Sequence, residues 1–176
     1  MIDGQLVNLR APEMDDLDRN TRWVNDSEVT RFLSMRYLMS RLAEEAWLRD
    51  LTSRPMSYAG PFFAIETKDG QHVGNVNLFN VQPEDRSCEL GIMIGEQPLW
   101  AKGYGSDALR TVLAFAFDEM NLNRVQLHTY DFNQRARAAY KKVGFVEEGT
   151  LRQAHYTAGA YADAIVMSVL RDERGQ

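Results

Sequence analysis

The stretch ELGIMIGEQPLWAKGYGS, which runs from Glu89 to Ser106, decides the fold of this chain. It continues a short run from Cys88 to Ile94 that is apolar except for one acid and one glycine, a pattern typical of a central strand. A glycine-containing loop follows, and from Ser106 to Met120 apolar residues recur at helical spacing. We therefore predict a buried strand, a glycine-rich loop and a helix, in this order.

The glycine-rich loop is suited to binding a phosphate group. The first N–H groups of a helix have no partners within it, and the helix dipole adds partial positive charge. Gly103 and Gly105 let a ligand approach the backbone closely, and Lys102 could add a charge. The loop matches neither the P-loop nor the dinucleotide fingerprint, so on its own it is equally consistent with a turn that binds nothing.

A second stretch, NQRARAAYKKVGF from Asn133 to Phe145, follows about thirty residues after the loop. Together the two stretches resemble the GNAT superfamily of acyl-CoA-dependent N-acetyltransferases. The first is similar to the family's pyrophosphate loop, R/Q-x-x-G-x-G/A, and the second to its segment N-x-x-A-x-x-x-Y-x-K-x-G-F. From Val7 onward the chain is similar to the RimJ/RimL-type branch of ribosomal-protein alanine acetyltransferases, close to the spermidine acetyltransferases. Trp100 stands where the superfamily has Arg or Gln, and we expect little effect because the loop acts mainly through its backbone.

The order of the elements predicts a single domain over residues 1–176. Strand-like runs bounded by turn residues occupy 62–67, 72–80, 86–94, 124–130, 145–151 and 161–170. The first three form an antiparallel meander, a helix is predicted over 134–143, and the last two strands are joined by an irregular stretch. The resemblance implies an α/β fold of the GNAT type. Its mixed, largely antiparallel sheet has six to seven strands, splayed at the cofactor site, with about four helices on its faces.

The composition restricts the classes of protein that need to be considered. The chain has 176 residues, 44% of them hydrophobic and 26% charged, as in an ordinary globular protein. The net charge of −5 argues against nucleic acid as a partner and suits a cationic amine. A single cysteine, Cys88, excludes an internal disulfide and a four-cysteine zinc site, and we expect it to be buried and unreactive.

No apolar run approaches the ~20 residues of a membrane span. The N-terminus does not resemble a signal peptide, so we expect a cytoplasmic enzyme without a membrane partner.

The resemblance implies that acetyl-CoA binds as the acetyl donor and that no metal is needed. The pantetheine arm would pair with the strand backbone at Ile92, Met93 and Ile94, and Asn133 would hydrogen-bond the same arm. The pyrophosphate would lie on the backbone N–H groups of the loop. The loop residues concerned are Trp100, Ala101, Lys102, Gly103, Tyr104, Gly105 and Ser106.

Two side chains are candidates for the proton transfers of the reaction. An amine must lose its proton before it attacks a thioester, and Glu89 is the candidate base because burial in an apolar strand strengthens a carboxylate as a base. A salt bridge from Glu89 to Arg86 or Arg124 is the alternative. The thiolate of CoA must be protonated as it leaves, and Tyr140 matches the family's general acid. His128 could also reach the cleft, although most lone strand histidines do not.

The acceptor side is less well defined. In the family, two helices and the loop between them shape the acceptor groove, so Trp23 and Tyr37 are candidate substrate contacts, with core packing as the alternative for each. Tyr156 and the neighbouring His155 lie between the last two strands and could also border the groove.

The implied activity is acetyl transfer to a primary amine by direct attack in a ternary complex. A protein or peptide N-terminus is the preferred acceptor. A polyamine or an aminoglycoside, or a non-catalytic acyl-CoA-binding sensor, are the alternatives, and the acidic charge with Glu44 and Glu45 leaves polyamines open. The sequence does not determine the oligomeric state, and a homodimer is the commonest default.

Overall fold

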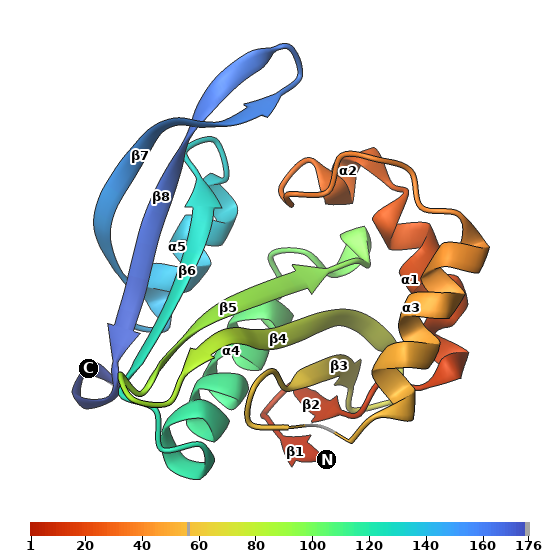
Figure 1. The fold of residues 1–176 in the computed structure, drawn as a ribbon, viewed down its shortest axis with the longest axis horizontal. Helices are drawn as coiled ribbons and strands as arrows, with labels where there is room; N and C mark the ends of the chain where they lie inside the picture. The colour runs from red at the N-terminus through yellow and green to blue at the C-terminus, as the bar shows by residue number, and fades with distance from the viewer. Residues whose placement is uncertain (56, 175–176) are drawn as a thin grey trace.

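The computed structural model describes residues 1–55 and 57–174, which form one eight-stranded sheet with helices packed around it (Figure 1). The strand order is β1-β2-β3-β4-β5-β6-β8-β7, and every neighbouring pair is antiparallel except β5 and β6. The strands are β1 (Ile2–Asp3), β2 (Val7–Arg10), β3 (Phe62–Thr67), β4 (His72–Gln82), β5 (Ser87–Ile94), β6 (Arg124–Tyr130), β7 (Val146–Thr157) and β8 (Ala160–Leu170). The α-helices are α1 (Leu17–Val24), α2 (Ser27–Thr30), α3 (Arg41–Ser53), α4 (Tyr104–Ala114) and α5 (Gln134–Lys142).

The predicted mixed, mostly antiparallel α/β architecture is confirmed. The structure has eight strands and five α-helices, compared with the predicted six to seven strands and about four helices. β1 has two residues, which is below the length at which hydrophobic periodicity can identify a strand.

The sheet opens between β5 and β6. Their parallel pairing covers only Ser87–Glu89 on β5, opposite Arg124–Gln126 on β6. Beyond Glu89, β5 remains paired with β4 as far as Ile94, but its other edge has no strand beside it. Figure 1 shows the two strands diverging from this point. The opening leaves backbone N–H and C=O groups of β5 free of sheet pairing on one side, which is the splay that the resemblance implied.

The core lies where α4 packs against the sheet. Ala108, Leu109, Val112 and Leu113 form one buried face of this helix and join the apolar side chains of the central strands. The helix begins at Tyr104, two residues before the predicted start, and continues beyond its α-helical part as a π-helical turn over Phe115–Glu119. The core therefore holds the start of α4, and the loop before it, in a fixed place beside β5.

The last two strands were predicted from the sequence, but the long hairpin that β7 and β8 form was not. Its strands have 12 and 11 residues, and it extends beyond the ends of β5 and β6 (Figure 1). Ala158 and Gly159 connect the strands with positive φ angles of 49° and 82°, as in a type I′ turn. The prediction of an irregular stretch is wrong because Ala-Gly is not one of the dipeptides that signal such a turn.

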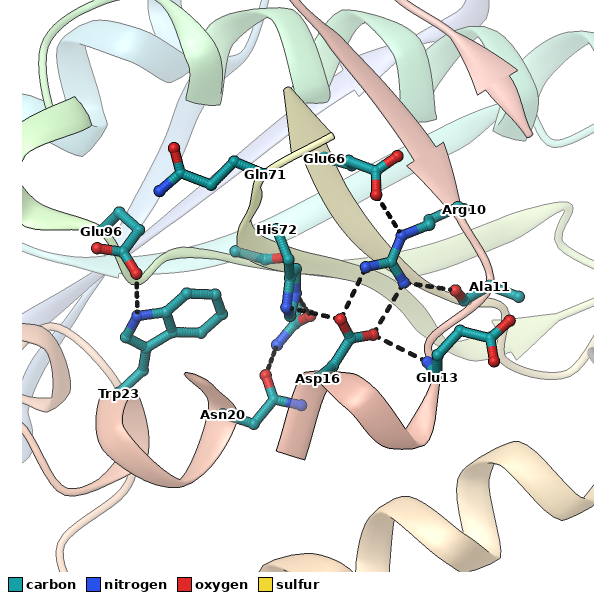
Figure 2. Close-up of polar contacts among 12 residues, drawn as sticks. Arg10, Ala11, Glu13, Asp16, Asn20, Trp23, Glu66, Gln71, His72 and Glu96 are labelled. Atoms are coloured by element: carbon teal, nitrogen blue, oxygen red, sulfur yellow. Dashed lines mark hydrogen bonds and ion pairs between the residues drawn. The ribbon is translucent and has the colours of Figure 1, made fainter. Parts of the chain in front are cut away.

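A buried polar network fastens the segment before α1 to the sheet (Figure 2). Arg10 donates to both carboxylate oxygens of Asp16 at 2.7 and 2.8 Å, and Nδ1 of His72 lies 3.0 Å from the same carboxylate. Burial opposes ionisation of Asp16, but the hydrogen bonds from Arg10 and His72 outweigh it and hold the pKa of this carboxyl well below its usual range. Asp16, at the start of the first helix, thus has a structural role.

Candidate active site

A cavity of about 900 Å³ lies where β5 and β6 diverge. Its walls come from β5, the glycine-rich loop, β6, α5, the β7–β8 hairpin and the segment between α2 and α3. The walls bring together residues that the sequence placed in two separate motifs, namely Glu89, Gly103, Gly105, Asn133 and Tyr140.

The glycine-rich loop has the geometry that close approach to its backbone requires. Gly103 is the N-cap of α4 and has a φ of 95°, in the left-handed region that favours glycine. Gly105 has an ordinary φ, and a Cβ there would meet only Cγ1 of Ile94 at 3.6 Å, so the fold itself leaves room for a larger residue. The loop residues Trp100, Ala101 and Ser106 line the cavity as well, whereas Lys102 and Tyr104 do not. The fit to a phosphate therefore rests on the backbone, and the charge expected from Lys102 lies outside the cavity.

Trp100 occupies the place of the usual Arg or Gln and ties the loop to the end of β5. Its indole N–H donates to the carbonyl oxygen of Ile94 at 2.7 Å. The guanidinium carbon of Arg135, at the start of α5, lies 3.8 Å from the centre of the indole ring, a close cation–π contact. Trp100, which replaces the Arg or Gln of the family pattern, thus connects the end of β5 with the start of α5. Ile92 and Met93 line the cavity too, and the carbonyl of Ile94 is already hydrogen-bonded within the protein.

Tyr140 and Asn133 are both contributed by α5 and its N-cap. Tyr140 is buried, lines the cavity and packs against Phe145, and burial raises the pKa of its phenol to about 12. The hydroxyl therefore keeps its proton at neutral pH, as a general acid must. Asn133 caps α5 by accepting the N–H of Ala136 through Oδ1, which leaves its amide Nδ2 without a hydrogen bond to a described residue.

Glu89 lies on the opposite wall, on β5. Its carboxylate accepts a hydrogen bond from Asn80 at 3.0 Å, and Oε2 lies 3.7 Å from Nδ1 of His128 on β6. The alternative of a salt bridge with Arg86 or Arg124 is wrong, because Arg86 bonds to Asn121 and Arg124 pairs with Glu148. The side chain of Glu89 is 22% exposed, so it is less buried than the apolar strand predicts. His128 does reach the cavity.

The cavity is not lined by Trp23, Tyr37 or Tyr156, the three residues predicted to contact substrate. Trp23 is a core residue, 1% exposed, that packs edge-on against His72 and donates to Glu96 (Figure 2). The side chain of Tyr37 is exposed, and Tyr156 packs against Tyr161 on the hairpin.

Other residues line this side of the cavity instead. Phe32, Ser34 and Arg36 contribute from the segment after α2, and His155, which the sequence predicts beside Tyr156 at the groove, contributes from β7. Periodicity could not identify the first three residues, because the segment after α2 is not helical.

Three further features of the described residues concern metal binding, membrane crossing and thiol reactivity. Residues 1–55 and 57–174 contain no cluster of three or more His, Cys, Asp or Glu side chains arranged to hold a metal ion. In the same residues, no helix has the length and apolar character needed to cross a membrane. Cys88 is buried, and burial together with the neighbouring charge of Glu89 raises the pKa of its thiol to about 12, so the thiol is unreactive as predicted.

Comparison with known proteins identifies the family of the chain. Residues 7–146 match the family model described as "Acetyltransferase (GNAT) domain". A Bacillus subtilis protein named as a candidate ribosomal N-acetyltransferase, YdaF, is 33% identical over 105 residues, which are 60% of this chain and 57% of that protein. The spermidine N(1)-acetyltransferase of Escherichia coli K12 is 27% identical over 95% of this chain and 87% of its own length.

The solved structures include a similar protein with ligands bound. The spermidine N-acetyltransferase of Vibrio cholerae in complex with CoA and spermine superimposes with a TM-score of 0.85 at 26% identity, over 96% of this chain and 97% of that one. The matched protein binds CoA, which makes the cavity between β5 and β6 a candidate site for the same cofactor in this chain.

Proposed function

Because the chain belongs to the GNAT acetyltransferase family and is an acetyl-CoA-dependent N-acetyltransferase, we propose that its acceptor is the N-terminal α-amine of a protein or peptide. This is the activity of the RimJ/RimL-type branch, to which we assign it. We also propose that it works in the cytoplasm as a single domain spanning residues 1–176.

One observation carries the assignment of the site. The same cavity is lined by a candidate base on β5, a candidate acid on α5 and a left-handed glycine at the N-terminus of α4. Glu89, with His128 beside it, takes the proton from the attacking amine, directly or through a water molecule. Tyr140 holds a proton at neutral pH and gives it to the leaving thiolate.

The cofactor would be held mainly by backbone groups. Gly103, Gly105 and Ser106 would bind the pyrophosphate of acetyl-CoA, and Asn133 with the free edge of β5 would position its pantetheine arm. Acetyl-CoA supplies the activated acetyl group. The protein positions it, removes one proton and supplies another.

The charges of the cavity favour an N-terminal amine over a polyamine. Glu89 is the one carboxylate among the described residues that line it, whereas Arg36, Arg135 and Lys142 contribute three cationic side chains. A polyamine needs a carboxylate for each of several ammonium groups, and a peptide N-terminus needs one. The similarity to spermidine acetyltransferases keeps a polyamine as the second candidate. A non-catalytic acyl-CoA sensor would need neither Tyr140 nor Glu89.

The experiment is an acceptor screen with purified protein and acetyl-CoA. Ala- and Ser-initiated peptides, spermidine and an aminoglycoside are compared by initial rate, and mass spectrometry locates the acetyl group. We expect acetylation of the peptide α-amine with the highest kcat/KM. A higher kcat/KM for spermidine would overturn the acceptor assignment, and CoA binding without transfer to any amine would favour the sensor.

A further inference from the structure

Arg36 is a cation in the cavity that the reaction does not use. It lies in the segment between α2 and α3 and lines the same cavity as Glu89. Among the residues that the structure describes, no carboxylate forms an ion pair with it, whereas nearby Arg31 pairs with Glu28 and Arg41 pairs with Asp18. An arginine without a carboxylate partner, facing a cavity, is a ready binding group for an anion.

Arg36 lines the cavity together with residues at the ends of β6 and β7. Tyr130 on β6 and His155 on β7 are stacked there with ring centres 3.8 Å apart, and Phe132 packs against both rings. Burial raises the pKa of Tyr130 and lowers that of His155, and in both cases the positive charge of Arg36 acts to lower the pKa. Arg36, Tyr130 and His155 all line the cavity, and the two stacked rings form one part of its surface.

The other two cations of the cavity belong to the cofactor side. Arg135 packs on Trp100, whose indole is bonded to the end of β5, and Lys142 lies on α5 with Tyr140. They are therefore near the groups that would hold the pyrophosphate and pantetheine. Arg36 lies on a different segment, after α2, and no hydrogen bond or ion pair with a described residue engages its charge, which leaves it available to the acceptor.

We infer that Arg36 binds a carboxylate of the acceptor, so that the enzyme selects amines carrying an acidic group close to the reacting nitrogen and disfavours polycations. This inference rests on the proposed function, since it assumes that an amine is bound with its nitrogen near Glu89. The acceptor would then meet one negative group, Glu89, and one positive group, Arg36. An N-terminus followed by Asp or Glu is complementary to both groups, whereas the second ammonium group of a polyamine would be placed near the like charge of Arg36.

The test compares peptides that differ only at the second residue. Ala-Glu, Ala-Gln and Ala-Lys peptides of the same length, together with spermidine, are assayed with the wild-type protein, Arg36→Gln and Arg36→Glu. Arg41→Gln is the matched control, because Arg41 is an arginine at the start of α3 that pairs with Asp18 and does not line the cavity. Free glutamate is a further arm, which distinguishes an α-carboxylate from an acidic side chain as the source of the anion.

We expect wild type and Arg41→Gln to prefer Ala-Glu over Ala-Lys by about tenfold in kcat/KM, the effect of one partly exposed charge-assisted hydrogen bond. Arg36→Gln should lose this preference through a higher KM for Ala-Glu, and Arg36→Glu should reverse it. The dissociation constant of acetyl-CoA should be the same in all four proteins.

Two results would overturn the inference while leaving the proposed function in place. One is equal discrimination among the peptides by wild type and Arg36→Gln. The other is weaker acetyl-CoA binding by Arg36→Gln with an unchanged acceptor KM, which would make Arg36 a cofactor residue. Preference of the wild type for spermidine, or no transfer to any acceptor, would instead overturn the proposed function and this inference with it.

Discussion

Tyr140 is the residue on which the proposed chemistry depends most. Its phenol is buried beside the cavity, and burial raises its pKa to about 12. We predict that Tyr140→Phe lowers kcat at least tenfold, roughly the lower range for loss of a general acid, and leaves the affinity for acetyl-CoA unchanged. Steady-state kinetics together with a binding titration check both parts.

The pH dependence of kcat in the wild type tests the role of Tyr140 independently. A phenol is active as an acid only while protonated, and a pKa raised to about 12 keeps it protonated through the neutral and mildly alkaline range. We therefore expect no loss of kcat from this group until the pH is well above 10. An alkaline decline near neutrality that disappears in Tyr140→Phe would contradict the assignment.

Gly103 and Gly105 serve two different requirements of the loop. Gly103 allows its backbone conformation, and Gly105 leaves its backbone accessible to a ligand. Gly103 has a φ of 95°, which a residue with a Cβ adopts only with strain, whereas a Cβ at Gly105 has room in the protein. We predict that Gly105→Val folds with a melting temperature close to that of the wild type but binds acetyl-CoA at least tenfold more weakly, because the side chain obstructs the approach of the ligand. Calorimetry and thermal unfolding provide the two readouts. Normal affinity in Gly105→Val would remove the loop from the cofactor site.

At the scale of elements, the polar network of Asp16 determines how the first helix is attached to the sheet. Breaking a buried ion pair by removing one charge costs about 3 kcal/mol, so we predict that Asp16→Asn lowers the free energy of unfolding by about this amount at pH 7. The pKa of Asp16 is lowered in the folded state, so its contribution is present above the pKa of the unfolded chain, about 4, and is lost as the pH falls below it. The difference between the proteins should therefore shrink below about pH 4.

Urea unfolding at several pH values measures the difference in the free energy of unfolding between the wild type and Asp16→Asn. Asp18→Asn is the control, because the Asp18 side chain is 83% exposed and pairs with Arg41 at the surface. An equal loss of stability in both variants would contradict the special role of the buried carboxylate.

The sequence predicts most of the elements that surround the cavity, but not the residues of the segment between α2 and α3 that line it. The strand, loop and helix around Gly103 are predictable because apolar periodicity and glycine position act locally. Trp23 and Arg36 are different, because their burial or exposure depends on how the first helices pack on the sheet. Gly95 shows this dependence: a Cβ there would lie 2.1 Å from the Trp23 ring, a contact between residues 72 positions apart that no local pattern reveals.

The net charge of the whole molecule and the charge of the residues that line the cavity have opposite signs. The chain carries a net charge of −5, yet three cations and one carboxylate line the described cavity. The acidic composition suggested a cationic substrate, whereas the described lining of the cavity carries more positive than negative side chains. Overall charge reports on the solvated surface and does not predict the charge of a site assembled from distant segments.

We propose that the opening between β5 and β6 holds acetyl-CoA through the backbone of the loop before α4. Isothermal titration of the protein with acetyl-CoA, with adenosine as the ligand that lacks the pyrophosphate, tests it most directly. We predict saturable one-to-one binding of acetyl-CoA and no detectable binding of adenosine at the same concentrations. Absence of acetyl-CoA binding at millimolar concentration, or equal binding of both ligands, would contradict the account.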